Sequence, residues 1–157
     1  MIAEIQNPSE WQETLTLADH HDFYHTWDYH QISKSDGDIP MLIKYTEGNL
    51  LIVIPLLLKK ISGNELYDAT SVYGYAGPIS RNVKSSFDNS QFHREFQNYL
   101  VSKRIISVFS RLNPFVPKQT AILKDIGNLI VAGEIVSVDL SQDALEQRKG
   151  YGRRLRT

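Results

Sequence analysis

The chain has 157 residues, which suits one compact domain and is long enough to bury a hydrophobic core. Hydrophobic residues make up 41% of the sequence and charged residues 22%, so a largely disordered chain is excluded. The formal net charge is −1, which gives no overall field to attract DNA or an anionic membrane. The absence of cysteine excludes disulfide bonds, thiolate-bound metals and a cysteine nucleophile.

The predicted elements alternate in type along the chain. We expect a helix at about 9–19, with Ser9 as its cap, and a second helix that begins at Thr26 and ends near Lys34. Apolar stretches on both sides of Glu47-Gly48-Asn49 then predict a β-hairpin. The stretch 65–79 that follows is expected to be a strand running into a glycine-rich loop. The remaining expected elements are a helix at 88–104, a strand at 105–112, a short helix at 118–126, two strands at 128–133 and 134–140, and a helix at 141–149 capped by Ser141.

The second arm of the hairpin contains the longest apolar run, Leu50 to Leu58. A membrane-spanning helix needs about 20 apolar residues, so this run is too short to span a bilayer. Pro55 lies at its centre, and proline in a sheet is restricted to edges and irregular positions, so we expect a buried strand with a local irregularity. The first residues lack the basic and apolar regions of a signal peptide, which makes the cytoplasm the expected location.

This order of elements predicts an α/β (α+β) fold in which helices flank a mixed β-sheet. The last predicted helix is followed by no strand that could return to the sheet. We therefore expect one module at 1–140 and, at 141–157, a linking helix with a basic tail at which the chain looks cut.

Four of the five histidines lie close together, namely His20, His21, His25 and His30. They lack the HExxH pattern, and a zinc site would also need a third protein ligand, so we expect no metal site. As single imidazoles, His25 and His30 are candidate general bases, because a neutral imidazole titrates near physiological pH.

An aromatic stretch broken by glycines is the most informative part of the sequence. Tyr73 and Tyr75 would point to the same side of an extended strand, and tyrosine offers both an apolar face and a hydroxyl for a polar substrate. Gly77 and Pro78 would turn the backbone sharply and allow a ligand to approach it. The alternative is an aromatic core strand that ends in an ordinary turn.

A basic residue follows the next predicted strand. Arg111 lies in "SRLNPF", where the buried strand predicted from Ile105 onward comes to its end. In α/β folds ligand-binding groups often stand at this position, and an arginine there could clamp a phosphate or carboxylate. A surface arginine at a strand end is the alternative.

The basic tail contains the letters Q-x-x-G-x-G at Gln147, Gly150 and Gly152. They match the loop by which GNAT acyltransferases hold the pyrophosphate of coenzyme A on backbone N–H groups at a helix N-terminus. A nucleic-acid patch and a solvated basic terminus are the alternatives.

The chain as a whole resembles bacterial Fem-related proteins, which are GNAT-fold acyltransferases similar to the enzymes that build peptidoglycan bridges. The resemblance rests on "FYHTWDYH", "DATSVYGYAGP", "VFSRLNPF", "GEIVSVDLS" and "QRKGYGRRLR", in this order. It implies that the chain is the first of two GNAT-like modules. It also implies that the acceptor cleft is lined by Tyr73, Tyr75, Gly77 and Pro78, with Tyr29, His25 and Arg111 as looser matches. Ala76 stands where Fem enzymes typically carry an arginine before the Gly-Pro pair.

The expected function is transfer of an acetyl or aminoacyl group to an amine. By resemblance, the donor is an acyl-CoA or an aminoacyl-tRNA, with no covalently bound cofactor, and the acceptor is a small amine or a peptidoglycan precursor. The alternative is a non-catalytic GNAT-like module for binding or oligomerisation, which acts as a homodimer or with a second module.

Overall fold

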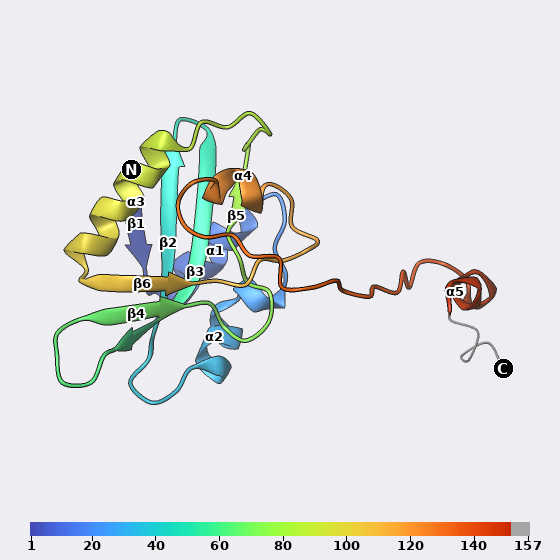
Figure 1. Ribbon diagram of the computed structural model, residues 1–157, viewed down its shortest axis with the longest axis horizontal. Helices are drawn as coiled ribbons and strands as arrows, with labels where there is room; N and C mark the ends of the chain where they lie inside the picture. Colours follow the sequence, from blue (N-terminus) through green and yellow to red (C-terminus); the bar gives the residue numbers. More distant parts are fainter. Residues whose placement is uncertain (152–157) are drawn as a thin grey trace.

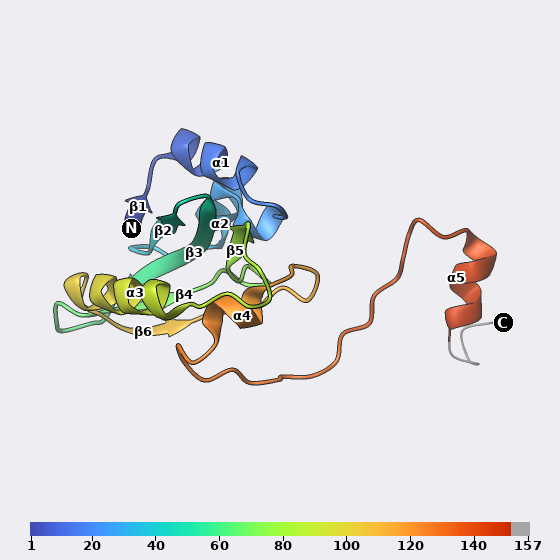
Figure 2. The ribbon, with the colours of Figure 1, turned by 90° about the horizontal axis from the view of Figure 1, so that it is seen from above.

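The computed structural model describes residues 1–151 and contains one mixed β-sheet with helices on both faces (Figures 1 and 2). This confirms the α/β class expected from the sequence. The elements are, in chain order, β1 (Ile2–Ile5), α1 (Pro8–Thr16), the short 3₁₀ helix η1 (Phe23–His25), α2 (Trp27–Ser33), β2 (Ile39–Glu47), β3 (Leu50–Lys60), β4 (Tyr67–Thr70), β5 (Ile79–Arg81), α3 (Ser90–Ser102), β6 (Ile105–Phe109), α4 (Gln119–Leu123) and α5 (Ala144–Gly150).

The strands run in the order β1-β2-β3-β4-β6, and β5 pairs with β3 beside this path. The β2–β3 hairpin is present as predicted, with Glu47 opposite Leu50. All neighbouring strands are antiparallel except β4 and β6, which are parallel. Helix α3 connects this parallel pair, so the carboxyl ends of β4 and β6 lie at the same edge of the sheet (Figure 1).

One edge of β3 is shared by two short strands. Leu57–Lys60 pairs with β4, whereas Leu51–Val53 pairs with β5. Within the part of the chain that the structure describes, Ile54–Leu56 has no strand partner on that side. Pro55 stands in this gap, so the irregularity expected around it is present, and the chain between β4 and β5 leaves the sheet as the loop at 71–78.

Alternation along β2 and β3 sends side chains into a core on each face of the sheet. On one face the predicted apolar stripe of α3 buries Phe92 and Phe96. On the other face α1 buries Trp11 and Leu15. Each such side chain stabilises the fold by about 1.5–3 kcal/mol. The sheet contributes Met41, Ile43, Ile52 and Ile54 to the first core, and Leu42, Leu51 and Val53 to the second.

Two of the predicted strands are wrong. The stretch 65–79 does contain a strand that runs into a glycine-rich loop, but the strand ends at Thr70, so Tyr73 and Tyr75 lie in the loop rather than in an extended strand. The stretches 128–133 and 134–140 form no strand; their residues are exposed and run away from the sheet (Figure 1). Their β-branched composition favours an extended backbone, but a strand also needs a hydrogen-bonding partner.

Other differences concern the ends of elements. Strand β1 was not expected, because its four residues are too few to show a periodic pattern. Asn7, rather than Ser9, caps α1 by accepting hydrogen bonds from the backbone N–H groups of Ser9 and Glu10. Helix α5 begins at Ala144 and is capped by Asp143 rather than by Ser141. Thr26 caps α2 as predicted.

Among residues 1–151, every helix is too short or too polar to cross a membrane.

Candidate functional site

The loop at 71–78 and the chain after β6 meet at the carboxyl ends of the parallel strands. The Ser71 backbone N–H donates to the Phe109 carbonyl at 2.8 Å, and the Arg111 N–H donates to the Ser71 hydroxyl at 3.2 Å. These bonds place the Arg111 guanidinium 5.7 Å from the centre of the Tyr73 ring. Arg111 therefore follows a strand end, as predicted, and shares a surface with the loop. Ligands commonly bind at this edge of α/β sheets.

Aromatic side chains gather on this loop and on the segment that packs against it. We call them the aromatic surface, which consists of Phe23, Tyr24, Tyr29, Tyr73 and Tyr75. The ring centres of Phe23 and Tyr24 are 4.0 Å apart, and that of Tyr75 is 6.1 Å from that of Tyr24. The Tyr29 hydroxyl donates to the Tyr73 carbonyl at 3.1 Å. The side chain of Tyr73 is 80% exposed and that of Tyr75 is 39% exposed, so both rings are available to a ligand.

Two glycines let this loop pack closely against its neighbours. Gly74 has φ +111° and Gly77 has φ +44°, both in the region that disfavours other residues. A β-carbon at Gly74 would collide with the Tyr24 ring, and one at Gly77 would collide with the Gln119 amide. The glycines therefore bring the loop backbone against neighbouring side chains, rather than against open space for a ligand. Both Gly77 and Pro78 are buried, so neither lines an exposed cleft as the resemblance implied.

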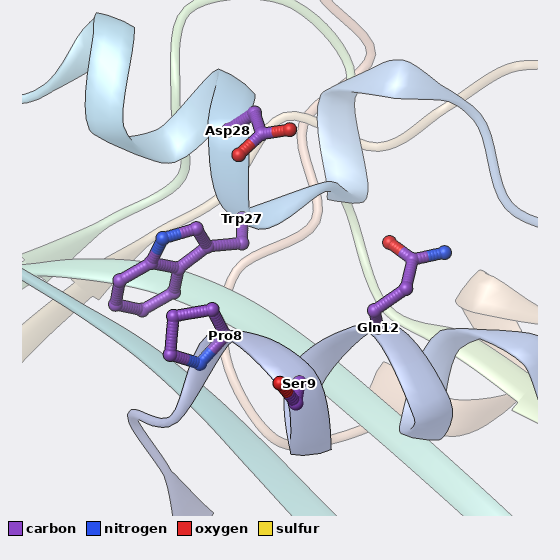
Figure 3. A pocket seen from close by; sticks show the side chains of 5 residues that line it. All are labelled: Pro8, Ser9, Gln12, Trp27 and Asp28. Atoms are coloured by element: carbon purple, nitrogen blue, oxygen red, sulfur yellow. The ribbon is translucent and has the colours of Figure 1, made fainter.

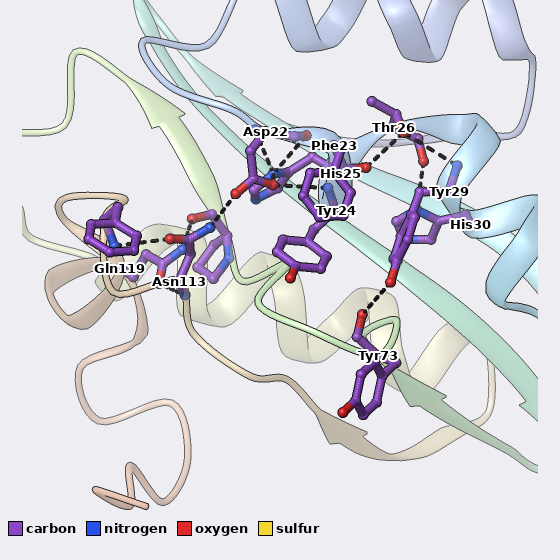
Figure 4. A network of polar contacts seen from close by, with 12 residues as sticks. Asp22, Phe23, Tyr24, His25, Thr26, Tyr29, His30, Tyr73, Asn113 and Gln119 are labelled. Carbon is purple, nitrogen blue, oxygen red and sulfur yellow. Dashed lines mark hydrogen bonds and ion pairs between the residues drawn. The ribbon is translucent and has the colours of Figure 1, made fainter. Parts of the chain in front are cut away.

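A chain of buried polar contacts holds the Gly77-Pro78 corner in place (Figure 4). The Gln119 amide donates to the Pro78 carbonyl at 2.9 Å, and its oxygen accepts from the Asn113 N–H at 2.8 Å. The Asn113 amide in turn donates to the Asp22 carboxylate at 2.7 Å. Asp22, Pro78 and the segment from Asn113 to Gln119, which are distant in the sequence, thus form one network, which we call the Asp22–Gln119 network.

The candidate bases His25 and His30 are buried behind the aromatic surface, with no side-chain exposure. The Asp22 N–H donates to Nδ1 of His25 at 3.1 Å as part of a capping box around η1. Nδ1 of His30 lies 2.9 Å from the Thr26 carbonyl. Nε2 of each ring is buried without a hydrogen-bond partner among residues 1–151. Neither imidazole therefore reaches the protein surface, where a substrate would bind.

Burial also keeps both imidazoles neutral. Desolvation lowers the pKa of His25, although Asp22 and the Ala76 backbone partly oppose this effect. Desolvation lowers the pKa of His30 to about 4, and the Thr26 carbonyl opposes it only in part. Both rings are therefore uncharged at neutral pH, which suits structural residues inside a core.

The predicted coenzyme loop has a different local structure. Gln147 and Gly150 lie inside and at the end of α5, so they do not precede a helix N-terminus as the pyrophosphate loop requires. Gly152 lies outside the residues that the structure describes. The geometry at Gln147 and Gly150 does not form an anion-binding turn.

Two depressions lie elsewhere on the surface. One, of about 470 Å³, lies between α1 and α2 and is lined by Pro8, Ser9, Gln12, Trp27 and Asp28 (Figure 3). The other, of about 260 Å³, is lined by Asp19, His20, Ser80, Val83, Val116, Pro117 and Lys118. Neither depression is lined by a residue of the aromatic surface. Across residues 1–151, no three histidine or carboxylate side chains gather as a metal site would require.

Sequence reasoning missed several residues of this region. Phe23 and Tyr24 belong to the aromatic surface, and Asn113 and Gln119 belong to the buried network. Phe23 and Tyr24 lie six and five residues before Tyr29 in an aromatic stretch, which is a signal that could have indicated them. The two amides carry no such signal, because their partners are remote in the chain.

Compared with models of protein families, with curated proteins and with solved structures, the chain matches none.

Proposed function

We propose that the chain is an acyl-transfer module that binds an amine acceptor at the aromatic surface beside Arg111. The observation that carries this proposal is the position of Tyr73 and Arg111 next to each other at the carboxyl ends of the parallel strands. The resemblance to Fem-related and GNAT acyltransferases supplies the reaction class. Acyl-CoA or aminoacyl-tRNA would be the donor.

The aromatic surface suits an acceptor that carries an amine and an anionic group. Tyrosine faces attract cations and stack on apolar parts of a ligand, while a guanidinium binds a carboxylate or phosphate through two parallel hydrogen bonds. The Asp22–Gln119 network and the two tight glycine contacts hold this surface rigid, so little conformational entropy is lost on binding. An amino acid, a peptide stem or an amino sugar phosphate has this combination of groups.

In the proposed reaction the amine nitrogen forms a bond to the activated carbonyl carbon of the donor. The carbon–sulfur bond of a thioester, or the carbon–oxygen bond of an aminoacyl ester, then breaks. The proton lost by the amine passes through water to the leaving thiolate or alkoxide. Because His25 and His30 are buried, the chain's contribution is to bind and orient the acceptor, which can supply much of the rate of an acyl transfer.

Titration calorimetry with acetyl-CoA and with aminoacyl-tRNA, beside an assay of acetyl transfer to small amines, tests this proposal. The chain has no cysteine, so every thiol released in the assay comes from the donor. We expect binding and turnover, and we expect Arg111→Ala to lower acceptor affinity about tenfold or more, because a hydrogen bond to a charged group is lost. Arg94→Ala, which removes an exposed arginine on α3, is the control and should leave affinity unchanged. Absence of binding and of product with both donors would contradict the proposal.

The burial of both candidate bases favours one alternative, a non-catalytic binding module that holds the same ligands without chemistry. Binding of an amine that depends on Arg111 but gives no product with either donor would support this alternative.

A further inference from the structure

The outer edge of β6 is open. Among residues 1–151 β6 pairs with β4 alone, and it forms the end of the strand order. After Ile105 its side chains are exposed, and Ile106 is 61% exposed. An uncovered edge strand with apolar side chains is a surface on which another strand readily pairs.

A second apolar stretch of the same chain has no cover. In the segment 134–140 apolar and polar side chains alternate from Val136 to Leu140, and Val136 is 97% exposed. The segment is extended and leads away from the sheet toward α5 (Figures 1 and 2). It therefore carries the pattern of a strand without the partner that would make it one.

We propose that segment 134–140 of one chain pairs with the outer edge of β6 in a second copy of this chain. When the two strands are aligned at their middle serines, Ser137 lies opposite Ser107 whichever direction the added strand runs. The apolar residues that then share one face of the sheet are Ile106, Val108, Val136 and Val138. The pairing covers these four side chains and gives hydrogen-bond partners to backbone groups on the β6 edge.

The charges at the two ends of these strands are complementary. Arg104 and Arg111 lie just before and just after β6, whereas Glu134 and Asp139 lie near the two ends of the segment. In either strand direction each carboxylate approaches one arginine. Opposite charges at adjacent positions favour this pairing over pairing of two β6 edges, which would bring arginines together.

A second copy is the occupant because the segment leads away from the β6 of its own chain. If two copies exchange their segments, both open edges are covered by the same twofold operation, and the assembly closes as a dimer. The pairing does not depend on acyl transfer, and the carboxylate that approaches Arg111 would compete there with an anionic acceptor. A chain that is monomeric would therefore leave the proposed function untouched.

Sedimentation of the full chain at increasing concentration, with thiol crosslinking, tests this pairing. Each of two variants, Ser107→Cys and Ser137→Cys, has a single thiol because the natural chain has no cysteine. When the two variants are mixed with a short bis-maleimide, we expect a covalent heterodimer. Ser9→Cys, at an exposed position on α1, which lies on the opposite side of the molecule from β6 (Figure 2), replaces Ser107→Cys in the control mixture and should give little product.

A surface substitution provides an independent measurement. Val136→Glu should weaken the dimer at least about tenfold, because it puts a charge among apolar side chains. Since Val136 is almost fully exposed in the single chain, the variant should keep the circular dichroism of the natural protein. Leu145→Glu, which changes an exposed leucine on α5, should leave the dimer intact. A chain that stays monomeric, or a dimer that neither crosslinks through Ser107 and Ser137 nor responds to Val136→Glu, would overturn the proposal.

Discussion

The ring of Tyr24 lies against the α-carbon of Gly74 and fills the space where any other residue would have its β-carbon. This contact joins the segment before α2 to the loop between β4 and β5. Val72 and Ala76, on either side of Gly74, pack with Tyr24 and Tyr29 against Leu57 of β3. The loop that presents Tyr73 and Tyr75 is therefore positioned from within by a small apolar cluster.

Gly74→Ala should destabilise the fold strongly. The new methyl group would collide with the Tyr24 ring and would also force alanine to adopt a positive φ. Positive φ alone costs about 1–2 kcal/mol, and displacement of a packed ring costs a further 1–3 kcal/mol or so. Gly37→Ala is the matched control, because Gly37 has φ +86° with open space around it. Equal losses of unfolding free energy in urea for the two variants would show that Tyr24 yields without cost.

Asn113→Ala should break the Asp22–Gln119 network. The substitution removes the amide that donates to Asp22 and leaves a buried gap beside Gln119, so we expect a loss of about 1–3 kcal/mol in unfolding free energy. Asn98→Ala, at an exposed position on α3, should change stability by no more than about 0.5 kcal/mol. Calorimetric melting of both variants would check this, and a melting temperature for Asn113→Ala equal to that of Asn98→Ala would contradict it.

The stability of the chain should depend on pH through His30. Its folded pKa of about 4 lies below the value of about 6.5 for an unfolded chain, so the unfolded state binds more protons between these values. The stabilisation is complete above pH 6.5 or so and falls by roughly 3 kcal/mol as the pH decreases toward 4. His25 acts in the same direction.

Urea unfolding followed by circular dichroism at several pH values measures this dependence. His30→Gln should flatten the slope between about pH 6.5 and 5, a range above the titration of most carboxylates. His21→Gln, at an exposed position, is the control and should keep the slope. An unchanged slope in His30→Gln would mean that His30 is not the group that titrates.

Tyr73→Phe and Tyr75→Phe should weaken ligand binding while the melting temperature stays nearly constant. Both side chains have substantial exposed surface, so each hydroxyl is available to a ligand without being needed for the fold. Tyr29→Phe is an informative comparison, because it removes the hydroxyl that donates to the Tyr73 carbonyl. It should lower stability by about 0.5–1.5 kcal/mol. A stability loss of 1–3 kcal/mol in Tyr73→Phe would assign that hydroxyl to a buried structural bond.

The parts of the fold that depend on local pattern can be predicted from the sequence. The β2–β3 hairpin follows from apolar stretches around Gly48, and α3 follows from the spacing of Phe92 and Phe96. Segment 134–140 shows where this approach fails, since its alternation fits a strand but no strand pairs with it among residues 1–151. Local composition specifies an extended backbone and leaves the partner open.

The site was predictable only in part. Tyr73 and Tyr75 could be singled out because they lie in an aromatic stretch broken by glycines, and Arg111 because it follows a predicted strand. Their arrangement depends on contacts such as that between Asp22 and Asn113, which are 91 residues apart in the chain. The burial of His25 could not be foreseen either, because it results from the packing of α1 and the Gly74 loop over η1.

Both tryptophans of the chain lie at one place, the contact between α1 and α2. The ring centres of Trp11 and Trp27 are 5.3 Å apart, and the Trp11 ring is 5.0 Å from that of His30. The tryptophan fluorescence of the protein therefore reports on this contact, and an imidazolium formed at His30 would quench the Trp11 emission. Neither the surface at Arg111 nor the edge of β6 contains a tryptophan, so ligands and a second copy there have to be followed by another signal, such as tyrosine emission or an added fluorophore.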